Sequence, residues 1–76
     1  MQTYEVFAHW DAEANVWWAE SESVPGLVAE AETVEALLQD LKAVVPELLT
    51  LNGVIPTEHR VALRLVTDRV EDLHLS

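Results

Sequence analysis

Histidines and carboxylates are the residues of this chain whose types could support acid–base or metal chemistry. His9 and Asp11 flank Trp10, and Glu20 and Glu22 lie two positions apart. Acid–base catalysis needs such groups within hydrogen-bonding reach, and a metal-assisted nuclease needs further ligands beside a pair of carboxylates. His9 is predicted to lie on a strand face while Asp11 begins a turn, and no third ligand accompanies the two glutamates. Neither pair therefore predicts a site.

The other histidines, the cysteine content and the glycines also predict no catalytic or metal site. The histidines, His9, His59 and His74, fall in different parts of the chain, and there are no cysteines to act as nucleophiles or metal ligands. Two glycines, Gly26 and Gly53, are too few for a phosphate-binding loop or a strand-to-helix nucleophile turn. We therefore expect no catalytic residues, no cofactor and no metal, and predict that the protein is not an enzyme.

The charge of the chain is strongly acidic. Fourteen Asp and Glu residues stand against four Lys and Arg residues, for a formal net charge of −10. Lys42 is the only cation before Arg60, so no basic stripe exists to neutralise phosphates. Direct binding of nucleic acid is thereby disfavoured. The acidity fits either simple solubility or the electrostatic steering of a basic partner.

The length and the hydrophobic content of the chain limit the number of domains and the size of the core. Seventy-six residues make a single domain, predicted over residues 1–68 with a short polar tail over residues 69–76. Half of the residues are hydrophobic and three are tryptophans, which is more apolar surface than one small core can hide. Self-association is therefore expected, as a dimer or higher homo-oligomer. Neither a signal peptide nor a membrane-spanning run is visible, so we expect a cytoplasmic protein.

The hydrophobic pattern predicts three strands, one helix and a fourth strand. Alternation predicts a first strand from Thr3 to Trp10 with its even-numbered residues facing the core. Apolar residues at three- and four-residue steps predict a helix from Val34 to about Leu51, capped by Thr33 and kinked at Pro46. The other predicted strands are Val16–Ser21, Leu27–Glu30 and Arg60–Thr67. The fold class is α+β, an antiparallel three-stranded meander plus a fourth strand, with one helix on one sheet face.

That arrangement leaves the opposite sheet face open. Phe7, His9, Trp17 and Ala19 are predicted to point there, a mixture too apolar for a purely solvated surface. We expect this set to form a homo-oligomer interface. The register of the first hairpin stays open by one residue, and a shift would exchange Trp17 and Trp18 between the faces.

Three segments carry a resemblance to a known family. The aromatic strand Val16–Glu20, the turn Val24-Pro25-Gly26-Leu27 and the helix start Glu32-Thr33-Val34-Glu35-Ala36-Leu37 together resemble the HicB-like antitoxin domain, over roughly residues 3–49. The resemblance implies a partial ribonuclease-H-like layer with sheet order 3-2-1-4 and no nuclease activity. It also implies a partner, a small basic HicA-type toxin that cleaves mRNA.

A charge argument then names candidate partner-binding residues. Glu20, Glu22, Glu30 and Glu32 would engage toxin cations, and Trp17 would serve as an apolar anchor. No ribbon-helix-helix or helix-turn-helix segment follows Thr67, so operator binding by this chain is not expected. The alternative is a homo-oligomeric interaction or small-ligand-binding module whose open sheet face is buried against itself.

Overall fold

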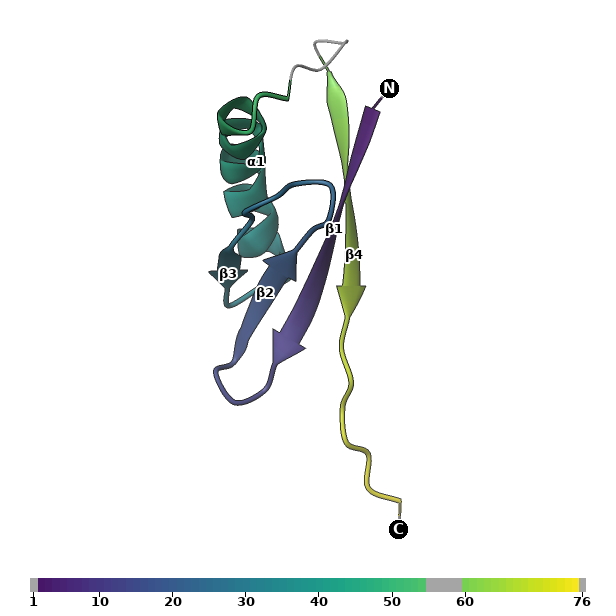
Figure 1. Cartoon of the computed structure of the whole chain (residues 1–76). Coiled ribbons are helices and arrows are strands. Elements are labelled where there is room, and N and C mark those ends of the chain that lie inside the picture. Colours follow the sequence, from purple (N-terminus) through teal and green to yellow (C-terminus); the bar gives the residue numbers. More distant parts are fainter. Residues whose placement is uncertain (1, 55–59, 76) are drawn as a thin grey trace.

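The computed structural model describes residues 2–54 and 60–75, and Pro56 and His59 lie outside these residues. One helix covers one face of a four-stranded sheet (Figure 1). The α+β class and the strand-strand-strand-helix-strand order predicted from the sequence are both confirmed. The elements are β1 (Gln2–Asp11), β2 (Val16–Glu20), β3 (Ala29–Ala31), α1 (Val34–Leu51) and β4 (Val61–Asp68).

The strands lie in the order β3-β2-β1-β4, which is the order that the family resemblance implies. Strands β1, β2 and β3 form an antiparallel meander, and β4 returns alongside β1 in parallel. In the chain, α1 lies between β3 at one edge of the sheet and β4 at the other edge. The long strand β1 therefore lies inside the sheet, whereas β3 and β4 form its two edges.

A short turn sets the register between β1 and β2. The Asp11 carboxylate accepts hydrogen bonds from the backbone N–H groups of Glu13 (3.0 Å) and Ala14 (3.3 Å). Asn15 adopts a left-handed conformation with φ of 56°, which asparagine tolerates better than most residues. The turn brings Trp10 opposite Trp17 and His9 opposite Trp18. This pairing decides which tryptophan faces the helix.

The segment between β2 and α1 is tied down by a turn and by hydrogen bonds. Pro25 and Gly26 (φ 82°) form the centre of a turn that the Leu27 N–H closes onto the Val24 carbonyl at 3.3 Å, the pattern of a type II turn. The Asn52 side chain donates to the Pro25 carbonyl at 3.0 Å, joining this turn to the end of the helix. Leu27 is buried beside the turn instead of pairing in the sheet. The predicted strand Leu27–Glu30 is therefore wrong in its bounds, and β3 begins only at Ala29.

Helix α1 begins and ends at the predicted signals. The Thr33 hydroxyl accepts a hydrogen bond from the Ala36 N–H at 3.0 Å, and the Asn52 N–H bonds the Leu48 carbonyl at 2.9 Å. The helix continues through Pro46 because the apolar stripe stays in phase on both sides of it. Its buried residues are Leu37, Leu41, Val45 and Leu49. They pack on the even-numbered residues of β1, as predicted, together with residues of β2.

Candidate functional site

The sheet face away from α1 gathers an unusual set of side chains. Because neighbours in register share a face, His9 and Trp18 lie on it side by side, and so do Phe7 and Glu20. Strand β3 adds Glu30, which pairs with Trp18. Following the same alternation, the open face comprises Thr3, Glu5, Phe7, His9, Val16, Trp18, Glu20, Glu30, Ala62, Arg64, Val66 and Asp68.

Aromatic rings occupy the middle of the open face. The Trp18 ring lies 4.6 Å from the His9 ring, centroid to centroid, with 34° between the planes. Trp18 is 39% exposed and Phe7 is 36% exposed. Phe7 has Val66 of β4 as its register partner on the other side. A solvent-facing sheet surface with this apolar centre is typical of an interaction site.

Carboxylates surround the aromatic centre. Glu20 lies 3.0 Å from His9 Nε2, and Asp68 lies 3.8 Å from His9 Nδ1. Glu5 pairs with Arg64 at 3.3 Å. Among the described strand residues of this face, Arg64 is the only arginine or lysine, so the face carries a net negative charge. The arrangement is an apolar patch with an acidic rim.

Trp17 and Ala19 do not lie on the open face, so the sequence-based placement of these two residues is wrong. Trp17 packs against Trp10 at 5.5 Å between ring centroids, on the side covered by α1, and Ala19 lies opposite the buried Ala8. Both are buried. The four-residue turn selects the register in which Trp18, not Trp17, is exposed with Phe7 and His9.

The predicted partner-binding glutamates divide into two groups. Glu20 and Glu30 flank Trp18 on the open face. Glu22 lies in the connection from β2 to β3, and Glu32 lies between β3 and α1; both are exposed. The structure therefore joins two of the four glutamates to the aromatic centre and leaves the other two on neighbouring loops.

The surroundings of two further residues, Trp18 and Arg69, were not predicted from the sequence. Trp18 takes the exposed position that had been assigned to Trp17. Arg69, just beyond β4, places its guanidinium 4.1 Å from the Trp10 ring centroid and 5.7 Å from that of Trp17. It also contacts Glu71 through Nε at 2.7 Å. No local pattern signals this cation–π contact, because it depends on the parallel docking of β4 against β1.

A family model for a domain of unknown function, DUF1902, matches residues 3–75. The chain belongs to the DUF1902 family. A solved relative of this DUF1902 chain is the hypothetical protein TTHA1013 from the extremely thermophilic bacterium Thermus thermophilus. The two are 50% identical, with a TM-score of 0.80, over 97% of this chain and 100% of that one. No curated protein matches the chain.

Two other kinds of feature are absent from the described part of this DUF1902 domain. Within residues 2–54 and 60–75, no group of three His, Asp or Glu side chains could hold a metal ion. In the same ranges, no helix has the length and apolar character needed to cross a membrane. We take the open face as the candidate functional site because exposed aromatic side chains and carboxylates meet there.

Proposed function

We propose that the open sheet face of this DUF1902 domain binds a small basic protein, as an antitoxin binds its toxin. The observation that carries the proposal is the exposed pair Trp18 and Phe7 surrounded by Glu20, Glu30 and Asp68. Protein interfaces commonly have an aromatic centre that excludes water and a polar rim. An acidic rim adds attraction to a basic partner and speeds the encounter.

The HicB-like resemblance supplies the partner class. It suggests a HicA-type toxin, a small basic ribonuclease that cleaves mRNA. Such an enzyme needs a cationic surface to hold phosphates, and a carboxylate-rich face competes for that surface. In this proposal the domain acts by occupying the toxin's RNA site and performs no catalytic step of its own. Trp18 is the apolar anchor, and Glu20 and Glu30 pair with toxin cations.

The alternative function, a module that self-associates through the open face, is less well supported by the charges. Two copies meeting face to face would bring together two surfaces that both carry a net negative charge, with Glu5, Glu20, Glu30 and Asp68 against one Arg64 on each. Like charges in direct opposition destabilise an interface. A basic partner avoids this repulsion.

The test begins with the host genome. If a short basic reading frame adjoins the gene, its product is co-expressed with the tagged full-length chain; otherwise the tagged chain is used to capture partners from the native host. Binding and inhibition of RNA cleavage are then measured at about 50 and about 300 mM NaCl. We expect a small basic partner whose affinity falls as salt rises, because the attraction between exposed charges is screened.

Matched variants locate the surface. Trp18→Ala is expected to weaken binding by at least about 30-fold, corresponding to about 2 kcal/mol for an interface anchor. Glu20→Lys should also weaken it and reduce the salt dependence. Glu47→Lys makes the same charge change on exposed α1, on the other side of the sheet, and should leave affinity nearly unchanged. Retention of affinity by both open-face variants would contradict the proposal, as would the absence of any basic partner.

A further inference from the structure

The tail that follows β4 carries apolar side chains into solvent. Val70 is 84% exposed, Leu73 is 84% exposed and Leu75 is 90% exposed. Figure 1 shows the tail running on past the sheet in the direction of β4, away from the helix, and the molecule is 55 Å long but only 22 Å wide. Exposed leucines so close together on a projecting segment are unusual unless they contact a partner. The DUF1902 match extends to residue 75 and so includes this segment.

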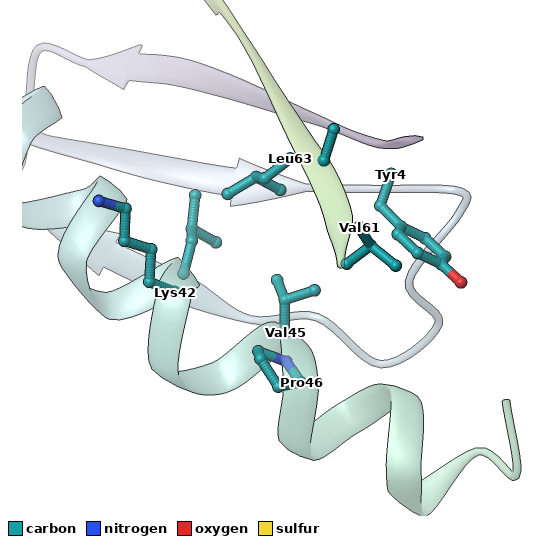
Figure 2. Close-up of a pocket in the computed structure, with 8 residues that line it drawn as sticks. Tyr4, Lys42, Val45, Pro46, Val61 and Leu63 are labelled. Carbon is teal, nitrogen blue, oxygen red and sulfur yellow. The ribbon is translucent and has the colours of Figure 1, made fainter. Parts of the chain in front are cut away.

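A groove lined mostly by apolar side chains lies at the other end of β4. Side chains from β1, α1 and β4 enclose a volume of about 160 Å³ between the helix and the edge strand (Figure 2). An engineered apolar cavity of about this size holds a benzene molecule, so this groove can hold an aliphatic side chain. It is lined by Tyr4, Leu41, Lys42, Val45, Pro46, Val61, Ala62 and Leu63.

The tail cannot reach the groove of its own chain. The groove lies beside Val61 and Leu63, at the start of β4, whereas the tail leaves after Asp68. A reversal needs at least two residues for the turn, and the returning residues then pair one by one with β4. With Arg69 and Val70 in the turn, Leu75 would return only as far as Arg64. The tail of the same chain, folded back along β4, therefore stops short of the groove, whereas the tail of another copy can reach it.

Strand alternation puts the tail leucines on the correct side. Leu63 and Leu65 face α1, and Arg69 lies over Trp10 on that same side. Leu73 and Leu75 have the same parity as these residues, so a tail that continues as a strand turns both leucines toward the helix side. That is the side on which the groove opens.

Charge and backbone geometry favour the same occupant. Lys42 lines the groove, and the tail carries Glu71 and Asp72 beside Leu73. Strand β4 is eight residues long, contains neither proline nor glycine, and forms an edge of the sheet. Its outer backbone groups are available for pairing with a second strand.

We propose that two copies of the chain pair antiparallel along the outer edges of their β4 strands, each tail placing Leu73 in the other copy's groove between α1 and β4 and Leu75 against Val61 at the edge of that groove. A two-fold axis near Asp68 sets Leu73 of one copy beside Leu63 of the other and Leu75 beside Val61. The contact is made twice by symmetry. It leaves the open sheet face free, so the proposal does not depend on the toxin-binding function.

Mass measurement tests the assembly. The full chain of 8.5 kDa is expected to sediment and scatter light as a dimer, and the double variant Leu73→Asp/Leu75→Asp as a monomer with an unchanged circular dichroism spectrum. Val28→Asp is the matched control, because Val28 is 85% exposed but lies just before β3, and it should remain dimeric. A monomeric wild-type chain would overturn the proposal, as would a dimer that the tail variant leaves intact.

Cross-linking tests the geometry. The chain has no cysteines, so a Leu63→Cys chain and a Leu73→Cys chain can be mixed and oxidised without background. Each chain then carries a single cysteine, so any disulfide must join two copies, and it forms only where the two Cα atoms lie within about 7 Å. We expect the 63–73 mixture to give a covalent dimer and a Val28→Cys with Leu73→Cys mixture to give none. A covalent dimer from the 28–73 mixture and none from the 63–73 mixture would show that the tail does not lie beside Leu63, which contradicts the proposal.

Charge reversal provides a rescue. Lys42→Glu should raise the dissociation constant of the dimer, and adding Glu71→Lys should lower it again. If the double variant dissociates further than Lys42→Glu alone, Lys42 does not face the tail's acidic residues.

Discussion

Adjacent residues Trp17 and Trp18 have opposite environments. Trp17 is 8% exposed, packed against Trp10 and covered from one side by the Arg69 guanidinium. Trp18 is 39% exposed and contacts His9. Trp17 therefore belongs to the hydrophobic core, and Trp18 is available to a partner.

Substitution of the two tryptophans should separate stability from binding. We expect Trp17→Ala to lower the free energy of unfolding by about 3–5 kcal/mol, because it leaves a large cavity in the core. Trp18→Ala should lower it by about 1 kcal/mol or less, as at exposed sites generally. Urea unfolding followed by circular dichroism measures both. If Trp17→Ala fails to fold, Trp17→Phe supplies a smaller loss that should still exceed that of Trp18→Ala; equal losses would contradict the assignment.

The sequence predicted that the two tryptophans face opposite ways but not which one faces the helix. Alternation is a local property, whereas the choice of face depends on how many residues the turn after Asp11 consumes. The Asp11 hydrogen bonds and the positive φ of Asn15 were both foreseeable from the residue types. The register that these two features produce together was not foreseeable. The predicted open face therefore contained Trp17 and Ala19 in place of Trp18.

At the scale of elements, substitutions at Asn15 test the left-handed conformation in the turn that sets this register. Asn15→Gly should keep stability close to that of the wild type, since glycine also adopts the left-handed conformation readily. Asn15→Val should cost about 1–2 kcal/mol, because a β-branched residue is strained there. Thermal unfolding of both variants measures the difference. A valine variant as stable as the glycine variant would show that the turn relaxes to another conformation.

The first turn of α1 depends on the hydroxyl of Thr33. Thr33→Ala should reduce the free energy of unfolding by about 1 kcal/mol, because the Ala36 N–H loses its acceptor. Thr33→Ser keeps the acceptor and serves as the control. Chemical denaturation should rank the serine variant well above the alanine variant; the opposite ranking would mean that the threonine methyl group matters more than the cap.

The bounds of the elements with long, regular patterns were predicted more closely than those of the shortest strand, β3. The helix was recovered from Val34 to Leu51 even across Pro46, because its apolar residues stay on one stripe. The third strand was predicted to begin two residues too early, because Leu27 resembles a strand residue in sequence but is buried beside the Pro25-Gly26 turn. In so short a stretch, the same apolar residues are expected whether they are buried at a turn or in a strand.

For the whole molecule, the net charge of −10 should oppose folding through self-repulsion. The melting temperature should therefore rise by several degrees between about 10 and about 300 mM NaCl, since added salt shortens the range of that repulsion from about 30 Å to well under about 10 Å. Differential scanning calorimetry at one fixed protein concentration measures the change. A melting temperature that falls with salt would show that local ion pairs such as Arg64 with Glu5 outweigh the overall repulsion.

The parallel pairing of β1 with β4 has a consequence for synthesis of the chain. Gln2 pairs with Val61 and His9 with Asp68, so each pair joins residues 59 positions apart. A nascent chain can form the hairpin and helix early, but one edge of β1 stays bare until β4 has been translated. Val66 and Asp68, which complete the open face, arrive at the same late stage. A nascent chain whose β4 has not yet emerged from the ribosome therefore lacks part of the open face, and the proposed binding surface is complete only after β4 has paired with β1.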